Sequence, residues 1–217
     1  SEMCIRDRQY NVQHMDMNGN SELTVPQNTL GAELRQLENK QWEQITLPHT
    51  PFVEPLTVLH QWQGICYYKK KITITPEEAK KHIWIEFEGA MHLADVWING
   101  KHVMQHAGGY TPFVVDATGL LKTGKENELL VRLDNRNNSL IPPGKPLETL
   151  DFCYYGGIYR NVHLIAKADV HITHPILDGH PAGAGIFITY PKVSQELSVV
   201  DAKTEIKNTS DKEKVVE

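Results

Sequence analysis

Residues 93–100 read LADVWING, and this stretch decides the fold class. Apolar and polar side chains alternate along it, which is the period-two pattern of a β-strand with one apolar face. The apolar face would carry Ala94, Val96 and Ile98. Asn99-Gly100 follows at once and predicts a type I′ turn, because both central residues of that turn need a positive φ angle. The stretch therefore predicts an antiparallel hairpin that returns over residues 101–105.

Further alternating stretches surround this hairpin. Period-two patterns predict strands over residues 69–75, 82–88, 127–134, 158–165 and 169–173. Glycine and proline clusters such as Pro142-Pro143-Gly144 separate them, and residues 76–81 and 118–121 suit short helices. Many short strands divided by turns are typical of an all-β, antiparallel sandwich of the jelly-roll type.

The composition changes near Lys167. Glycine, proline and histidine become frequent from Ala168 onward, and strands are then expected over residues 185–190, 197–206 and 214–217. They look like the first strands of an immunoglobulin-like sandwich, which needs about 7 strands and 100 residues. We therefore divide the chain into an N-terminal extension (1–24), a jelly-roll domain (25–167) and an incomplete immunoglobulin-like domain (168–217). An incomplete sandwich exposes unpaired strand edges, so we expect the last part to be loose.

Charge and hydropathy exclude several classes of partner. The net charge is −5 at pH 7 and basic residues are scattered, so we expect no nucleic-acid partner. The short run Lys69-Lys70-Lys71 is interpreted as a solvated strand end. Apolar runs stay well below the roughly 18 residues that a membrane span needs, so we expect no membrane partner.

Cysteines and histidines give no sign of a metal or disulfide framework. Residues 1–8, SEMCIRDR, match nothing downstream and resemble a translated adapter sequence, so they stay outside the fold prediction. Cys66 and Cys153 are then expected to be buried free thiols. His171 and His174 would point to opposite faces of a strand, so we predict no metal site there.

Six short motifs follow one another along the chain. They are WEQITLPHT (42–50), GICYYKKKITI (64–74), FEGAMHLADVWING (87–100), GGYTPFVV (108–115), NELLVRLD (127–134) and DFCYYGGIYRNV (151–162). In this order they resemble the N-terminal region of glycoside hydrolase family 2, from about residue 25 to the end. Residues 51–64 look most like the β-galactosidase branch of that family.

The resemblance implies a galactose-binding-like jelly roll, then an immunoglobulin-like domain, then an (α/β)₈ barrel. In the family this barrel carries two glutamates, and retaining hydrolysis needs their carboxyl groups roughly 5–5.5 Å apart. No counterpart of the barrel is found within residues 1–217, so we expect this part alone to be inactive. The expected partners are a carbohydrate (a β-galactoside or a related sugar) and the barrel itself, and the resemblance allows a homo-oligomeric parent. We expect no cofactor here, although the parent barrel would have room for a divalent or monovalent metal.

Asp151 is the main candidate for substrate contact. The resemblance places it where family members use an aspartate, just before the glycine turn, to bind sugar hydroxyls. An ionised carboxylate accepts two hydroxyl hydrogen bonds and so orients a sugar ring. The alternative is that Asp151 caps the turn over residues 152–157.

Several neighbours are candidates for weaker or structural roles. His49 and Tyr155 are further substrate-binding candidates. The alternative for His49 is a hydrogen-bonded loop residue, and the alternative for Tyr155 is an aromatic ring packed in the core. Gly156 and Gly157 are expected to allow a positive φ angle or a close backbone approach. Arg160 is expected to pair with an acid beneath this turn.

Two other functions remain open at this point. A free-standing carbohydrate-binding module uses the same scaffold, and a purely structural domain would bury Asp151 against backbone amides. Within the family, β-glucuronidase and β-mannosidase are alternatives to β-galactosidase. The expected compartment is the bacterial cytoplasm or the periplasm, and the sequence does not decide between the two.

Overall fold

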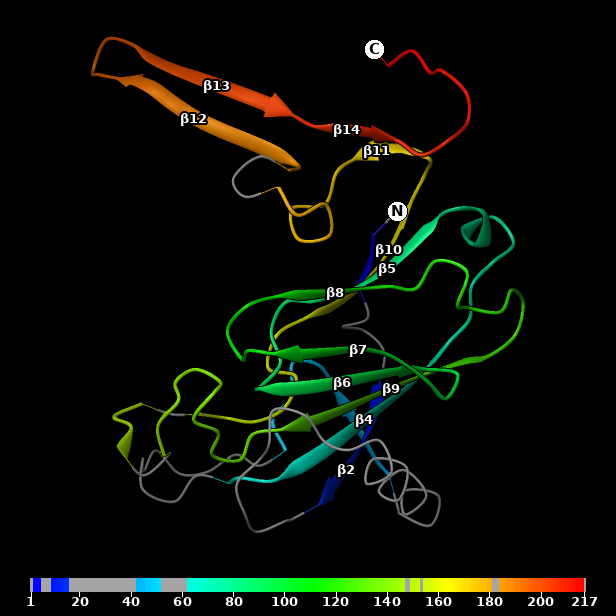
Figure 1. Cartoon of the computed structure of the whole chain (residues 1–217), viewed down its shortest axis with the longest axis vertical. Coiled ribbons are helices and arrows are strands. Elements are labelled where there is room, and N and C mark those ends of the chain that lie inside the picture. Colours follow the sequence, from blue (N-terminus) through cyan, green and yellow to red (C-terminus); the bar gives the residue numbers. More distant parts are fainter. Residues whose placement is uncertain are drawn as a thin grey trace.

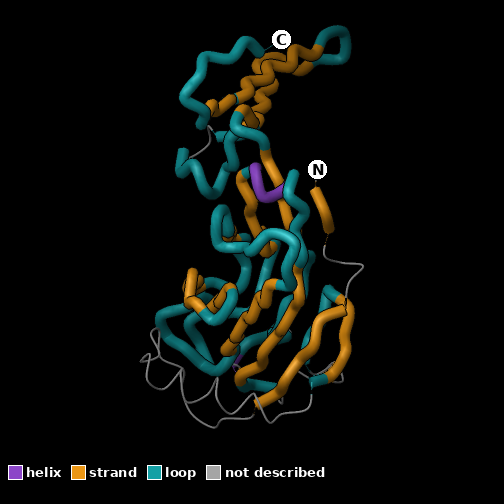
Figure 2. Tube along the Cα trace, turned by 90° about the vertical axis from the view of Figure 1, so that its right-hand side faces the viewer, coloured by secondary structure: helices purple, strands orange, loops and turns teal. Residues whose placement is uncertain are grey.

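The fold is seen in a computed structural model of the chain (Figure 1). The structure describes residues 2–4, 9–15, 42–51, 62–146, 149–152, 154–180 and 184–216. Two antiparallel sheets form the main body, and two smaller pairs of strands follow them. Figure 2 shows the molecule from the side, with the smaller pairs at the end that carries the C-terminus.

The larger sheet has six strands in the order β3-β2-β4-β9-β6-β7. Its strands are β3 (Glu43–Thr46), β2 (Gln9–Met15), β4 (Ile65–Ile72), β9 (Asn127–Asp134), β6 (Leu93–Ile98) and β7 (Lys101–Ala107). The second sheet has the order β1-β10-β5-β8. Its strands are β1 (Glu2–Cys4), β10 (Val162–Lys167), β5 (His82–Phe87) and β8 (Phe113–Asp116).

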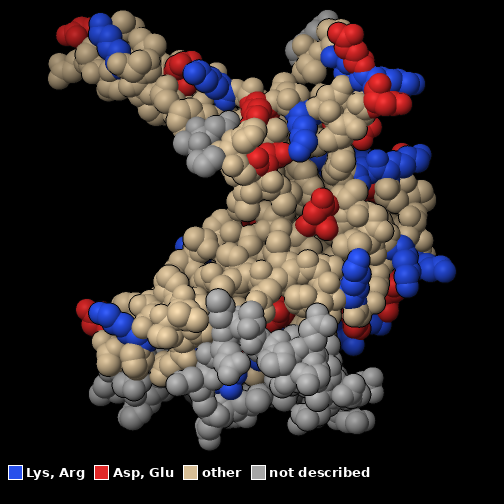
Figure 3. Space-filling model, in the orientation of Figure 1, with Lys and Arg blue, Asp and Glu red and all other residues tan. Residues whose placement is uncertain are grey.

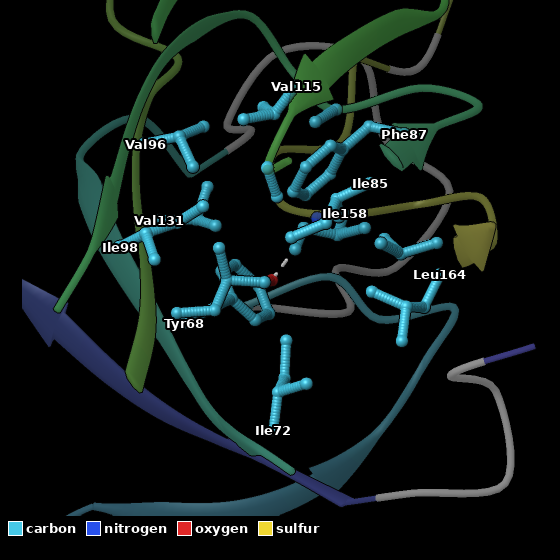
Figure 4. Close-up of a cluster of buried hydrophobic side chains, with 14 of the residues drawn as sticks. Tyr68, Ile72, Ile85, Phe87, Val96, Ile98, Val115, Val131, Ile158 and Leu164 are labelled. Atoms are coloured by element: carbon cyan, nitrogen blue, oxygen red, sulfur yellow. Dashed lines mark hydrogen bonds between the residues drawn. The ribbon is translucent and has the colours of Figure 1, made fainter. Parts of the chain in front are cut away.

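One hydrophobic core lies between these two sheets (Figure 4). The larger sheet contributes Tyr68, Val96 and Val131, and the facing sheet contributes Ile85, Phe87 and Leu164. All six side chains are at most 3% exposed. Because both sheets turn an apolar face to the same interior, the antiparallel β-sandwich expected from the sequence is confirmed.

The β6–β7 hairpin forms as predicted. Ile98 faces Lys101 across the turn, and both central residues, Asn99 (φ 51°) and Gly100 (φ 79°), have positive φ angles. The Asn99 side chain also accepts a hydrogen bond from the Glu128 backbone N–H at 3.1 Å. The predicted inward face of β6 does line the core, and so this stretch sets the register of the sheet centre.

The outer face of β6 differs from the simple polar-out expectation. Asp95 and Arg132 are both 0% exposed there. Arg132 lies 3.6 Å from Asp95 and 3.4 Å from the Asp134 carboxylate, and His102 lies 2.9 Å from Asp95. These buried charges compensate one another, which is the condition for burying a charge at all.

Two strands lie within the stretch that was assigned to an N-terminal extension. β1 pairs with β10, and β2 lies between β3 and β4. The segment Glu2–Cys4, which was left out of the fold prediction, therefore takes part in strand pairing. The structure thus adds an edge strand and an inner strand that the alternation pattern did not mark.

Several smaller expectations need correction. The predicted helix over residues 118–121 is a turn, and the one over 76–81 is a short 3-10 helix, Glu78–Lys80. The lysine run lies inside β4, not at a solvated strand end, and Lys70 is 8% exposed. Its neighbours form ion pairs, Lys69 with Glu128 and Lys71 with Glu126, each at 2.7 Å. Cys66 is a buried free thiol as expected, and burial raises its pKa, whereas Cys153 lies outside the described residues.

The part after Lys167 forms two separate strand pairs. β12 (Ile186–Val193) pairs with β13 (Ser198–Thr204), and β11 (Val170–Ile172) pairs with β14 (Ile206–Asn208). The β12–β13 hairpin projects away from the sandwich in Figure 1. The strand expected over residues 214–217 is absent from the described residues 214–216.

The two parts meet at Trp84, on the outer face of β5. The Trp84 ring is 5% exposed and packs edge-on against His171 and His174, with centroid distances of 5.3 and 5.4 Å. The expectation that these histidines face opposite ways is therefore wrong. β11 ends at Ile172, so the alternation of side chains does not extend to His174.

Charged side chains do not form a one-sign surface on the face shown in Figure 3. Lys and Arg are intermixed with Asp and Glu there. Among the described residues, no helix is long and apolar enough to cross a membrane. In the same part of the chain, no group of three His, Cys, Asp or Glu residues is placed to hold a metal ion.

Candidate functional site

The glycine turn before β10 is a tight corner between three segments of the chain. Gly157 has φ +95°, and a Cβ atom there would lie 2.7 Å from the His49 carbonyl oxygen. A Cβ atom on Gly156 would lie 2.8 Å from the Asn135 amide nitrogen. The expectation of a positive φ angle and a close approach is confirmed, because side chains at these positions would collide with their surroundings.

Tyr68 holds this corner from inside the core (Figure 4). Its hydroxyl accepts a hydrogen bond from the Ile158 backbone N–H at 3.3 Å and lies 3.1 Å from His49 Nδ1. Burial raises the pKa of Tyr68 well above its usual value, so the hydroxyl stays protonated. His49 also donates its own backbone N–H to the Ile158 carbonyl at 2.8 Å. The structure thus places His49 in hydrogen bonds beneath the corner.

Asp151 lies on the surface just before this corner. Its side chain is exposed, and it forms no hydrogen bond with another described residue. The neighbouring Phe152 is 43% exposed. Because the carboxylate is open to solvent, the alternative in which Asp151 is buried against backbone amides does not fit the structure.

The two tyrosines before the glycines take different positions. Tyr154 is 3% exposed and packs with Met91, and its hydroxyl is hydrogen-bonded to His92 Nδ1. Tyr155 is half-buried. Tyr154 is therefore an aromatic of the interior, whereas Tyr155 is the one with part of its surface open to solvent.

Arg160 does not form the expected ion pair. Its side chain is exposed and its guanidinium lies 5.6 Å from the Tyr159 ring centroid, without an acidic partner among the described residues. Tyr159 is itself anchored, because its hydroxyl donates to the Gly109 carbonyl at 2.5 Å. Arg160 therefore contributes a cation stacked on an aromatic ring at the surface.

The sequence analysis missed the role of Asn135. Its side chain accepts a hydrogen bond from the Gly64 N–H at 2.8 Å and donates to the Trp62 carbonyl at 3.0 Å. Trp62 lies beside Gly156, so Asn135 ties the two segments that support the glycine corner. The signal was the polar run after β9, residues 134–138 (DNRNN), which is unusual directly after a buried strand.

A small hollow is lined in part by Leu150, the chain neighbour of Asp151. Its lining includes His92, Asn138, Leu150 and Tyr154. Burial lowers the pKa of His92 to about 4, with the Asp134 charge opposing the shift, so His92 is neutral near pH 7. The hollow offers ≈ 10 Å³ to the centre of a water molecule, which suits one oxygen atom and not a sugar ring.

A second, more open hollow lies in the part after Lys167. It has a volume of ≈ 260 Å³ and is lined by Thr173, Asp178, His180, Glu205, Ile206 and Lys207. Its charges are paired with one another, Lys207 with Asp178 at 2.6 Å and His180 with Glu205 at 3.0 Å. Such pairs in open solvent contribute little to stability but shape a polar surface.

Comparison with known proteins gives one family. The model of "Glycosyl hydrolases family 2, sugar binding domain" matches residues 12–168. A protein of Bacteroides fragilis named beta-glucuronidase is 34% identical over 170 residues, which are 76% of this chain and 23% of that protein. A protein of Thermoanaerobacter pseudethanolicus named beta-galactosidase is 33% identical over 192 residues, which are 86% of this chain and 26% of that protein.

Solved structures agree in fold. The crystal structure of a Bacteroides uniformis beta-glucuronidase superposes with a TM-score of 0.70 at 27% identity, over 97% of this chain and 22% of that one. The chain thus spans about a quarter, or less, of the length of these relatives. Relatives of two specificities match it about equally well.

Proposed function

Since the chain belongs to glycosyl hydrolases family 2, we propose that it is the N-terminal, non-catalytic part of a β-glycosidase that helps to bind the terminal sugar. The observation that carries this proposal is Asp151, an exposed carboxylate without a partner among the described residues, presented by a rigid glycine corner. An unpaired carboxylate on a preorganised support suits hydrogen bonding to sugar hydroxyls.

The catalytic carboxylates would belong to a barrel outside these 217 residues. We therefore expect that residues 1–217 alone hydrolyse no glycoside and need no cofactor. A divalent or monovalent metal would belong to the barrel of the parent enzyme. The exposed Phe152 and Arg160, near Asp151 in the chain, would face that barrel or its substrate.

For the specificity, we propose β-galactosides first. The support is the similarity of residues 51–64 to the β-galactosidase branch and the beta-galactosidase relative. β-Glucuronides are the second candidate, because relatives named beta-glucuronidase match at the same level of identity. Both candidates would use the same Asp151, since both sugars carry ring hydroxyls.

The test compares glycoside hydrolysis by the protein of the full parent reading frame with hydrolysis by this chain alone. Nitrophenyl β-galactoside, β-glucuronide and β-mannoside are offered to both proteins. We expect the parent to cleave one of them and the chain alone to cleave none. Turnover by the chain alone would place the chemistry within residues 1–217 and overturn the proposal.

Asp151→Ala in the parent tests the role of the carboxylate. A hydrogen bond to a charged group contributes about 1.5–3 kcal/mol, so kcat/KM should fall roughly ten- to a hundred-fold. Asp201→Ala is the matched control, because Asp201 is an exposed carboxylate on the projecting hairpin. Equal activities of the two variants would remove Asp151 from the site.

A binding module is the second candidate function, favoured by the polar hollow at Thr173 and Glu205. It predicts that this chain alone binds galactose or glucuronate in a calorimetric titration. Binding that persists in Asp151→Ala but is lost in Glu205→Gln would favour the module over the proposal above.

A further inference from the structure

Two buried side chains of the small hollow at Leu150 have unused hydrogen-bonding atoms. His92 is 2% exposed and Asn138 is 8% exposed. Within the described residues, His92 Nε2 and Asn138 Nδ2 have no hydrogen-bond partner. A buried polar atom without a partner costs about 1–3 kcal/mol, so two of them lining one hollow call for a common explanation.

The orientation of both side chains is fixed by their other atoms. Asn138 Oδ1 accepts the Leu140 backbone N–H at 2.9 Å, so the free atom of this amide is the NH₂ donor. The other ring nitrogen of His92 is held by the Tyr154 hydroxyl. The two unused atoms therefore belong to side chains that cannot turn elsewhere without breaking these bonds.

The hollow has the size of one oxygen atom. Its ≈ 10 Å³ corresponds to about one water-sized sphere, and a buried water needs two to four polar partners. Of the two basic residues that line the hollow, Arg136 is engaged, because it binds the Asp134 carboxylate through Nε at 3.0 Å and Nη2 at 2.7 Å, whereas Lys145 is exposed at the rim. The neutral His92 and Asn138 side chains therefore offer at least one unused N–H donor to the hollow.

We propose that this hollow is a binding site for a single oxygen atom, held by His92 Nε2 and Asn138 Nδ2. The oxygen belongs either to an ordered water or to a hydroxyl or carboxylate of a bound sugar. In both cases it joins the loop of residues 135–145 to the start of β6. The site itself does not depend on the proposed function, whereas its use by a sugar does.

The tautomer of His92 tests one of the possible ligands, the sugar carboxylate, because a sugar hydroxyl, like a water, fits either tautomer. A carboxylate oxygen only accepts hydrogen bonds, so it requires a proton on Nε2, which the ring carries when Tyr154 donates to Nδ1. A water oxygen both donates and accepts, so it fits either tautomer. Long-range ¹H–¹⁵N NMR of the histidine rings reads the tautomer of the neutral ring directly.

The experiment is a high-resolution crystal structure of the chain, without sugar and with galactose or glucuronate, alongside the NMR spectra. We expect an oxygen about 2.7–3.2 Å from both nitrogen atoms without sugar. If the sugar replaces that oxygen, the His92 signals shift with it and the sugar is the source. If the oxygen stays and the signals do not move, water is the source. A hollow without an oxygen in every crystal would overturn the proposal.

Two variants control for changes in folding. Asn138→Asp keeps the acceptor for the Leu140 N–H and replaces the free NH₂ by an anionic oxygen. We expect it to retain a water but to reject a carboxylate, whereas Asn138→Leu should lose the oxygen altogether. Unchanged His92 signals in a folded Asn138→Leu protein would show that the two side chains share no ligand, and would contradict the site.

Discussion

Strands β5 and β12 both form antiparallel pairs, but β5 is mostly buried and β12 is mostly exposed. Both are rich in β-branched and aromatic residues. In β5 four of six residues are buried, whereas in β12 seven of eight are exposed. Strand pairing therefore follows from the local pattern, but burial requires a second sheet to pack against.

The β12–β13 hairpin shows what a strand pair lacks without that sheet. Its exposed large apolar residues are Ile186, Phe187, Ile188, Tyr190, Val193, Leu197, Val199 and Val200. A hairpin of two strands is marginally stable in water, and a surface of this kind is typical of an interaction site. The sandwich should therefore carry nearly all of the unfolding free energy of this chain.

The largest expected difference comes from one phenylalanine in each region. Phe87 is 0% exposed and stacks on Phe113 with a centroid distance of 4.6 Å. Phe87→Ala should lower the unfolding free energy by about 3–5 kcal/mol, measured by urea denaturation. Phe187→Ala, at a 38% exposed site, should change it by less than about 0.5 kcal/mol.

A large loss from Phe187→Ala would break this comparison. It would mean that a further surface covers the hairpin in solution, and light scattering would then show association. The same variant in the parent protein sharpens the comparison. If Phe187→Ala lowers the free energy of unfolding of the parent but not of this chain alone, Phe187 belongs to a surface that the parent covers.

Protonation of His92 should have the next largest effect on the free energy of unfolding. Its pKa in the folded protein, about 4, is below the usual value of 6.5, so the unfolded chain takes up this proton first as the pH falls. The stabilisation is complete above pH 6.5 and is lost between pH 6.5 and 4, by up to about 3 kcal/mol at 1.36 kcal/mol per pKa unit. Urea midpoints across this range measure the loss.

His92→Gln should flatten the pH dependence of stability, since glutamine does not titrate. Tyr154→Phe is the companion variant, because it removes a hydrogen bond of His92 and keeps the titrating ring. If the His92→Gln protein loses stability as steeply as the original between pH 6.5 and 4, other groups control acid unfolding.

Glycine-to-alanine substitutions in the two regions should give the smallest difference in the free energy of unfolding. Gly157→Ala adds a methyl group 2.7 Å from the His49 carbonyl at a positive φ, so we expect a loss of about 2–3 kcal/mol. Gly179 also has a positive φ, +65°, but its Cβ would meet nothing within 4 Å. Gly179→Ala should cost about 1 kcal/mol in denaturation experiments. Equal losses would show that backbone conformation, and not crowding, requires glycine at the corner.

Much of the fold could be predicted because its signals are local. The alternation in LADVWING gave the inward face of β6, and Asn99-Gly100 gave the turn. The strand assigned to residues 214–217 and the helix at 118–121 rested on equally short patterns; at 118–121 the chain forms a turn that packs Leu121 into the core. Short apolar runs are therefore ambiguous.

The site was predicted less completely. The positive φ angle of Gly157 and the crowding around Gly156 agree with the prediction, because glycine pairs signal unusual backbone. The ion pair of Arg160 and the opposite faces of His171 and His174 were wrong, since both depended on side-chain directions beyond a strand's end. The roles of His92 and Asn135 came from partners far along the chain, such as Tyr154, 62 positions after His92.

The sequence by itself determined most strands of the sandwich, the type I′ turn, the need for glycine before β10 and the family motifs. Each of these depends on neighbours within a few residues, where backbone sterics and side-chain period act. The tertiary structure alone decided which outer faces are buried, how Tyr68 reaches Ile158 across 90 positions, and which polar atoms share the small hollow. Those features depend on the packing of two sheets, and a local pattern does not contain that packing.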